Sequence, residues 1–262
     1  MSMRAIYRID RRGVGYGASM SDTEQNIVDA DLPEGPMAVV VTEPTGIEAK
    51  ATVVAFMDAP GIRPSLKEFS HRLAAEGYRV VLPDLYHRGG RLLGWEPAEA
   101  TDEDRAHMLE LFHSLTDAGI QADLDAALVA VGAQDETGMG TIGFCLGARA
   151  VYRTLMRLPE QFAAGAMWHP SLLVDEADDS PHLTARSLAQ PLYIGIGTAD
   201  QVQSIDMQRS FFDVAEPLEH VDLTIFEGAD HAFTWPTGPT YHEVAATESW
   251  AKTTALFSTT LG

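Results

Sequence analysis

Gly143-Phe144-Cys145-Leu146-Gly147 is the stretch that decides the fold of this chain. It follows the short apolar run 138–142 and precedes the run 148–152, Ala-Arg-Ala-Val-Tyr, so the order predicts a buried strand, a sharp turn and a helix. Glycine on both sides of the turn leaves room for the strand and the helix to pass closely. Cys145, the only cysteine of the chain, is therefore placed at the tip of the turn.

The same turn with serine in the middle is the nucleophile elbow of α/β-hydrolases, and Cys145 takes the place of that serine. A lone cysteine is more commonly a small buried hydrophobe, but the glycine frame favours a nucleophile. The N–H of Leu146 would then point at a developing oxyanion. The second donor in this fold comes from the loop after an early strand, here 57–61, which makes Ala59 the candidate.

A nucleophilic thiol needs a base, and the base needs an acid that orients it. His231 lies in a glycine-containing loop, 227–233, directly after an apolar run, which is where this fold presents its histidine. Asp200 ends the preceding apolar run and is the expected acid, although it is also suited to cap a following helix. Asp230 is the rival acid, but as a sequence neighbour its side chain is expected to point away from His231.

The remainder of the chain alternates short apolar runs with amphipathic ones. Strands are predicted over 37–43, 51–57, 78–82, 140–144, 163–168, 191–196 and 221–226. Helices are predicted over 63–76, 102–115, 119–132, 241–261 and around 202–214. This alternation predicts the α/β class, an α/β-hydrolase fold with a mainly parallel sheet flanked by helices on both faces. Its ligand site is expected at the carboxyl ends of the strands.

Composition narrows the class of protein further. The chain has 262 residues, of which 45% are hydrophobic, as expected of one large domain with a sizeable core. A single cysteine, no apolar run of about 18 residues and no signal-peptide core predict a cytoplasmic protein. The net charge of −20 disfavours nucleic acid and anionic membranes as partners, so we expect a small-molecule substrate and a monomer or homodimer.

The amino terminus differs from the rest of the chain. Residues 1–19 hold four arginines against one acid and include a glycine-rich stretch, 13–17. We interpret them as an appendage, disordered or preceding a true start at Met20, and residues 20–262 as a single domain.

Four segments together resemble the dienelactone hydrolase family: the elbow 143–147, Gly-Tyr-Arg-Val-Val-Leu-Pro-Asp-Leu-Tyr at 77–86, Gly-x-x-Asp at 197–200, and Asp-His-Ala-Phe at 230–233. The resemblance spans residues 30–260 and implies a Cys145, His231 and Asp200 triad that works without a cofactor or metal. It also implies that Asp58 holds the resting thiol and that Arg88 binds a substrate carboxylate.

The chain departs from the dienelactone enzymes at three places. Trp235 stands where they carry a second carboxylate-binding arginine after the catalytic histidine, and Asp58 replaces a glutamate. The run 168–171, Trp-His-Pro-Ser, is similar to the broader family and makes His169 a further candidate for substrate contact. An aromatic residue at 235 favours a more apolar acyl or lactone partner, with Trp235 as a substrate contact.

These observations predict a hydrolase that cleaves a carboxylic ester or lactone through an acyl-thioester. Two alternatives stay open from the residues alone: a thioesterase, and a non-enzymatic binding module in which Cys145 senses redox state. Gly138–Gly143 matches the Gly-x-Gly-x-x-Gly pattern, but it runs into and through a strand, which argues against a dinucleotide site. No metal-ligand spacing such as His-Glu-x-x-His is present.

Overall fold

The computed structural model describes residues 22–261, so the appendage predicted at 1–19 and the start suggested at Met20 lie outside the described part. Eight strands form one sheet in the order β1-β2-β4-β3-β5-β6-β7-β8. The strands are β1 Thr23–Ala30, β2 Met37–Pro44, β3 Thr52–Phe56, β4 Arg79–Pro83, β5 Met139–Phe144, β6 Phe162–Trp168, β7 Leu192–Gly197 and β8 Val221–Phe226.

Only β2 runs against its neighbours, pairing antiparallel with both β1 and β4, whereas all pairs from β4 to β8 are parallel. The helices are α1 Pro64–Ala75, α2 Asp102–Ser114, α3 Asp117–Ala130, α4 Leu146–Arg157, α5 Pro181–Thr184, α6 Arg209–Ala215 and α7 Glu243–Thr260, with a short 3-10 turn at Ala185–Ser187. The predicted class, a mainly parallel sheet with helices between its strands, is confirmed.

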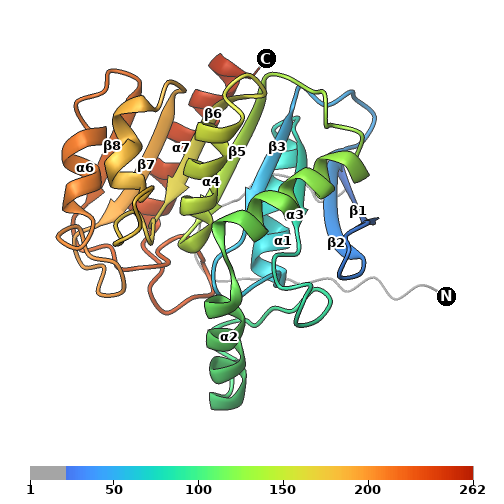
Figure 1. Cartoon of the computed structure of the whole chain (residues 1–262), viewed down its shortest axis with the longest axis horizontal. Coiled ribbons are helices and arrows are strands. Elements are labelled where there is room, and N and C mark those ends of the chain that lie inside the picture. Colours follow the sequence, from blue (N-terminus) through green and yellow to red (C-terminus); the bar gives the residue numbers. More distant parts are fainter. Residues whose placement is uncertain (1–21, 262) are drawn as a thin grey trace.

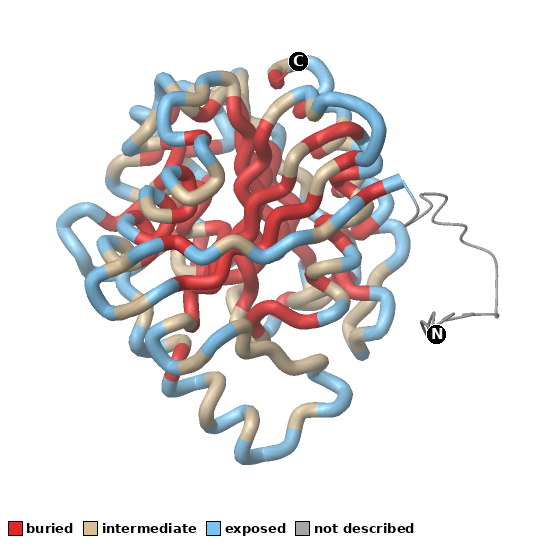
Figure 2. The backbone as a smooth tube through the Cα atoms, turned by 90° about the vertical axis from the view of Figure 1, so that its right-hand side faces the viewer, coloured by how far each residue is buried: buried red, intermediate tan, exposed pale blue. Residues whose placement is uncertain are grey.

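Helices cover both faces of this sheet (Figure 1). α1 and α7 pack on one face, and α3 and α4 pack on the other. The central strands are buried throughout, as the red tube in Figure 2 shows, because each of their faces meets a helix layer. α2 is the exception: it projects away from the sheet in Figure 1, and only Leu111 among its residues is buried.

Two local predictions differ from the structure. The antiparallel edge strand β1 was not predicted, because its sequence, Thr-Glu-Gln-Asn-Ile-Val-Asp-Ala, is largely polar and is buried only at its two ends. The helix predicted around 202–214 is reduced to α6, because residues 201–208 form turns that begin at Asp200. The Asp200 carboxylate accepts the N–H groups of Val202 and Gln203, at 3.0 and 2.7 Å, and so stabilises these turns.

The topology places the candidate site residues at one edge of the sheet. Asp58 follows β3, Cys145 follows β5, Asp200 follows β7 and His231 follows β8. The strands β3, β5, β6, β7 and β8 are consecutive neighbours and parallel, so their carboxyl ends lie together, as expected. Within residues 22–261, no helix is long and apolar enough to cross a membrane.

Candidate active site

The turn between β5 and α4 holds Cys145 in a strained backbone conformation, with φ 53° and ψ −117°. Such a conformation costs about 1–3 kcal/mol and persists only where its surroundings enforce it. Both flanking glycines are required: a Cβ on Gly143 would lie 2.1 Å from the carbonyl oxygen of Gly147, and a Cβ on Gly147 would lie 2.5 Å from that of Phe56. The glycine frame therefore specifies the turn that presents the thiol.

The loop after β6 supports Cys145. The Cys145 N–H donates to the Trp168 carbonyl at 3.2 Å, and the Cys145 carbonyl accepts the Ser171 N–H at 3.0 Å. The Ser171 hydroxyl also lies 3.3 Å from the Cys145 sulfur. Sequence reasoning did not single out Ser171, although it noted the run 168–171, because nothing local shows that this loop returns to the elbow.

His231 and Asp200 form a direct pair. The His231 Nδ1 and the Asp200 Oδ2 are 2.7 Å apart, and the Asp200 carboxylate is buried. Asp230 does not bond the imidazole; its Oδ1 accepts the backbone N–H of His231 at 2.7 Å. The structure thus pairs His231 with Asp200 and not with Asp230.

The environment of His231 favours its protonated form. Burial lowers the pKa of His231, but its hydrogen bond to the Asp200 carboxylate and the nearby Cys145 side chain outweigh burial and raise the pKa to about 10. The other ring nitrogen, Nε2, is buried without a hydrogen-bond partner among the described residues. The imidazole is therefore held by a carboxylate at Nδ1, while its Nε2 makes no hydrogen bond within residues 22–261.

His169 packs beside His231 and is enclosed by the protein. Its side chain is fully buried, its ring centre is 5.0 Å from that of His231, and its Nε2 bonds the Thr234 hydroxyl at 3.0 Å. Burial first, and then the nearby charge of His231, lower the pKa of His169 well below the usual range, so its ring is neutral. The expected substrate contact is replaced by a packing contact, because the whole ring is enclosed.

The two amides expected to stabilise an oxyanion lie at the starts of their turns. Leu146 is the first residue of α4, so its N–H has no partner within the helix. The Asp58 carbonyl accepts the Gly61 N–H at 2.9 Å. Because the Asp58 carbonyl and the Ala59 N–H belong to the same trans peptide, the Ala59 N–H points away from Gly61. The Tyr86 hydroxyl donates to the Ala59 carbonyl at 2.9 Å and fixes the loop further.

Asp58 is part of a buried cluster that the sequence did not reveal. Its carboxylate forms a bidentate ion pair with Arg63, one contact of which, between Nη2 and Oδ2, is 2.9 Å. The indole N–H of Trp235 donates to the same carboxylate at 2.9 Å, and the Arg63 guanidinium stacks 4.5 Å from the centre of the Trp235 ring. The structure thus gives Asp58 the partners Arg63 and Trp235, in place of the resting thiol expected from the sequence.

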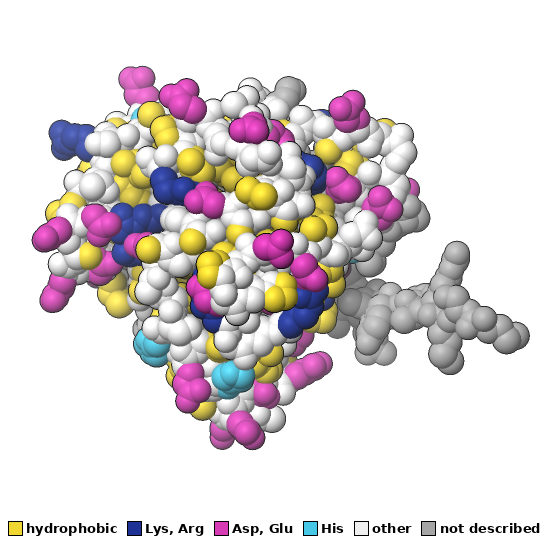
Figure 3. Space-filling model, turned by 45° about the vertical axis from the view of Figure 1, so that its right-hand side comes forward, with side chains coloured by type: hydrophobic (Ala, Val, Ile, Leu, Met, Phe, Trp, Pro, Cys, Tyr) yellow, Lys and Arg dark blue, Asp and Glu magenta, His cyan; other side chains and the backbone are white. Residues whose placement is uncertain are grey.

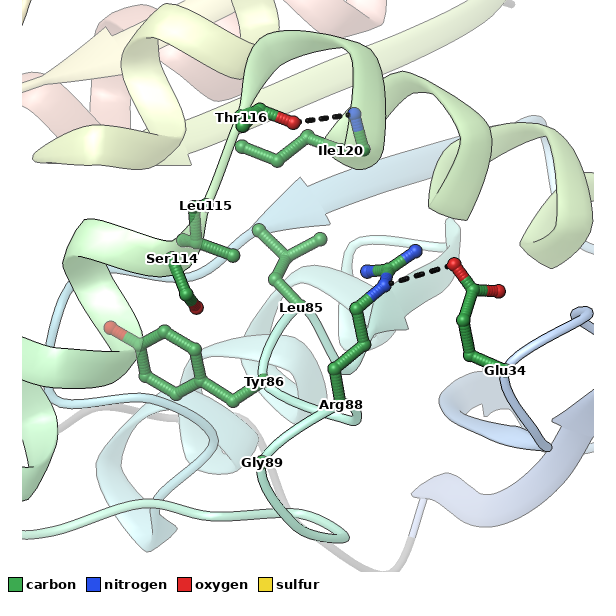
Figure 4. Close-up of a pocket in the computed structure, with 10 residues that line it drawn as sticks. Glu34, Leu85, Tyr86, Arg88, Gly89, Ser114, Leu115, Thr116 and Ile120 are labelled. Atoms are coloured by element: carbon green, nitrogen blue, oxygen red, sulfur yellow. Dashed lines mark hydrogen bonds and ion pairs between the residues drawn. The ribbon is translucent and has the colours of Figure 1, made fainter.

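Arg88 also differs from its expected role. Its guanidinium bonds both Asp123 oxygens, at 3.0 and 2.8 Å, and one Glu34 oxygen at 3.3 Å. It lines a cavity of about 230 Å³ between the loop after β4 and the start of α3, in which it points toward Glu34 (Figure 4). Asp123 is fully buried and occupies both terminal nitrogens of the Arg88 guanidinium. Arg88 therefore has no free pair of N–H groups with which to bind a substrate carboxylate.

A second cavity, of about 260 Å³, opens beside His231. Trp235 lines it, and its role as a substrate contact stays a prediction. The other lining residues are mostly apolar or uncharged: Pro97, Gln201, Val202, Ala232, Thr237, Gly238, Pro239 and Thr240, with Glu96 and Asp230. Within residues 22–261, no three His, Cys, Asp or Glu side chains are grouped as a metal site requires.

The elbow, the sheet topology and the residues at its carboxyl edge define an α/β-hydrolase. The sequence model of the dienelactone hydrolase family matches residues 37–261. The chain therefore belongs to the dienelactone hydrolase family, and with it to the hydrolases that act on esters or lactones.

Known relatives agree with this assignment. A carboxymethylenebutenolidase of Rhodococcus opacus is 28% identical over 222 residues, covering 79% of this chain and 80% of the relative. A solved dienelactone hydrolase-like promiscuous phosphotriesterase from metagenomic libraries has a TM-score of 0.70 at 22% identity, covering 92% of this chain and 100% of its own. The dienelactone hydrolase of Anabaena variabilis has a TM-score of 0.63 at 16% identity, covering 92% of this chain and 100% of its own. At these identities the two solved structures show a shared fold.

Proposed function

We propose that this protein hydrolyses a carboxylic ester or lactone with Cys145 as nucleophile, His231 as acid and base, and Asp200 as the group that orients His231. The observation that carries the proposal is the 2.7 Å bond between Asp200 and His231, formed beside a thiol on a strained elbow. A buried carboxylate at Nδ1 directs Nε2 toward the proton it must transfer.

The reaction takes place in two halves. The Cys145 sulfur, its proton passed to His231, attacks the carbonyl carbon, and the N–H groups of Leu146 and Ala59 stabilise the oxyanion. His231 then gives its proton to the leaving oxygen as the carbon–oxygen bond breaks, which leaves an acyl-thioester. Water attacks the thioester with His231 as base, the acid is released, and the thiol regains its proton.

Ser171 supports the resting state in this scheme. Its hydroxyl, 3.3 Å from the sulfur, is suited to hold the Cys145 side chain in place until substrate arrives. This gives Ser171 the positioning role that the family resemblance assigns to Asp58, whose oxygens are engaged by Arg63 and Trp235.

The test is hydrolysis of p-nitrophenyl butyrate, beside a dienelactone, by the wild type, Cys145→Ala and His231→Ala. We expect kcat/KM for the butyrate to fall by about 10⁴-fold or more in both variants, because members of a triad act as a unit. Circular dichroism and Tm check that each variant is folded. Wild-type activity that survives in folded Cys145→Ala would contradict the proposal and favour the binding or redox-sensing alternative.

A further inference from the structure

We propose that the site selects uncharged substrates and discriminates against esters or lactones that carry a carboxylate near the scissile bond. This inference rests on the proposed function and names its substrate class. It is carried by the charged side chains around three cavities at the carboxyl edge of the sheet. The charged groups there are either carboxylates or basic side chains that already pair with carboxylates.

The cavity beside His231 has an acidic lining. Glu96 and Asp230 are its two carboxylates, and none of the described residues that line it is lysine or arginine. Glu96 accepts the N–H of Ser65 at 2.8 Å and is 3.7 Å from the Arg63 Nε, so it is held in place by the start of α1. A substrate carboxylate here would face two negative groups, and the one basic side chain of the lining, His231, is already paired with Asp200.

Arg63, which is paired with Glu96 behind this lining, is out of reach of a substrate. The exposed fraction of its side chain is 0%, and the Trp235 ring lies over its guanidinium. The two terminal nitrogens of the Arg63 guanidinium already donate to the two carboxylate oxygens of Asp58. A second carboxylate would have to displace Asp58 and leave it buried without a counter-charge, which is unfavourable in a desolvated place.

The other two cavities repeat the same pattern. Arg88 is paired with Asp123 and Glu34 in the cavity of Figure 4. A third cavity, of about 320 Å³, is lined by Leu146 and Arg149. Arg149 bonds Asp117 at 2.8 Å and Asp175 at 2.6 Å, so its charge is matched as well.

The surface beyond the cavities has the same sign. In Figure 3, acidic side chains are spread over the face shown, and basic ones lie among them. The net charge of the chain is −20. An anionic substrate therefore meets repulsion both on approach and in the site, whereas an uncharged substrate with an apolar chain fits the lining beside Trp235.

The experiment compares p-nitrophenyl hexanoate with p-nitrophenyl hydrogen adipate, whose acyl chains have the same length and end in a methyl group or a carboxylate. We expect kcat/KM to be higher for the hexanoate by about tenfold or more at low salt, because like charges are brought together only in the adipate complex. Folded Cys145→Ala supplies the background rate for each ester. The ratio is expected to shrink in about 1 M NaCl, where screening acts over only about 3 Å.

Glu96→Gln tests the lining directly. It keeps an acceptor for the Ser65 N–H but removes a charge, so the hexanoate-to-adipate ratio should fall by about threefold. The matched control is Glu48→Gln, which removes the same charge from an exposed loop before β3, at the opposite edge of the sheet, and should leave the ratio unchanged.

Equal or better turnover of the adipate by the wild type would overturn this inference while leaving the proposed function intact. Turnover of neither ester above the Cys145→Ala background would instead overturn the proposed function, and the inference with it.

Discussion

Asp58 and Asp200 are two buried carboxylates that follow strands of the same sheet, yet their surroundings differ in kind. Asp200 bonds a titratable imidazole and two backbone N–H groups. Asp58 bonds a permanent cation, Arg63, and an indole N–H. The two residues have exposed fractions of 1% and 2%, so burial alone does not distinguish them. The partner decides whether a buried carboxylate serves chemistry or architecture.

The two aspartates have different partners because they lie in different parts of the carboxyl edge of the sheet. Asp200 lies at the same edge of the sheet as Cys145, and its bond to His231 Nδ1 leaves the second ring nitrogen, Nε2, available for proton transfer. The cluster of Asp58, Arg63 and Trp235 ties together the loop after β3, the start of α1 and the loop after His231. We therefore expect substitutions in the first group to cost activity and substitutions in the second to cost stability.

The largest effect is expected for Asp200→Asn. The amide oxygen of asparagine can still accept the N–H groups of Val202 and Gln203. The substitution removes the negative charge that orients the His231 ring and raises its pKa. kcat/KM for p-nitrophenyl butyrate should fall by about 10³–10⁴-fold, while Tm stays close to that of the wild type. A large drop in Tm with near-normal activity would reverse the contrast between the two aspartates.

Arg63→Met should act in the opposite way. It leaves Asp58 buried without its cation, so the free energy of unfolding should fall by about 3–5 kcal/mol in urea titrations. Arg105→Met is the control: Arg105 pairs with Asp102 in a largely exposed bridge, and its loss should cost about 0–1 kcal/mol. Equal stability of the two variants would show that the Asp58 cluster has no structural role.

The protonation of His231 offers a finer test. Its pKa is raised to about 10, so its proton stabilises the folded state fully below the unfolded value of about 6.5, and this stabilisation is lost as pH rises toward 10. In NMR spectra of histidine-labelled protein, His231 should still be protonated at pH 8 in the wild type. Asp200→Asn should lower its pKa, whereas Asp230→Asn should leave it nearly unchanged, because Asp230 bonds only backbone N–H groups.

The smallest effect is expected for Ser171→Ala. Removing one hydroxyl from the Cys145 sulfur should reduce kcat/KM by about two- to tenfold and change the rate at which iodoacetamide alkylates the thiol. Ser70→Ala removes a similarly buried hydroxyl, bonded to the Leu66 carbonyl, and should alter neither rate. An unchanged alkylation rate in Ser171→Ala would show that the hydroxyl does not position the thiol.

Much of this architecture can be predicted from short segments. Apolar runs between helices indicate the central strands, since a strand covered on both faces must be apolar along its length. β1 is missed because it is an exposed edge strand, and the residues after Asp200 are misread because side-chain bonds to the backbone replace a helix there. Local patterns predict elements well where burial dictates residue type and poorly where it does not.

By itself, the sequence determined the elbow and the order of Cys145, Asp200 and His231, because turn geometry and strand ends depend on neighbouring residues. Only the tertiary structure decided the partners of the other charged groups. It brought Trp235 to Asp58 across 177 positions of the chain, and it assigned Arg88 to Asp123 across 35. Pairing of this kind depends on which loops the packed sheet places side by side, and no local pattern encodes that arrangement.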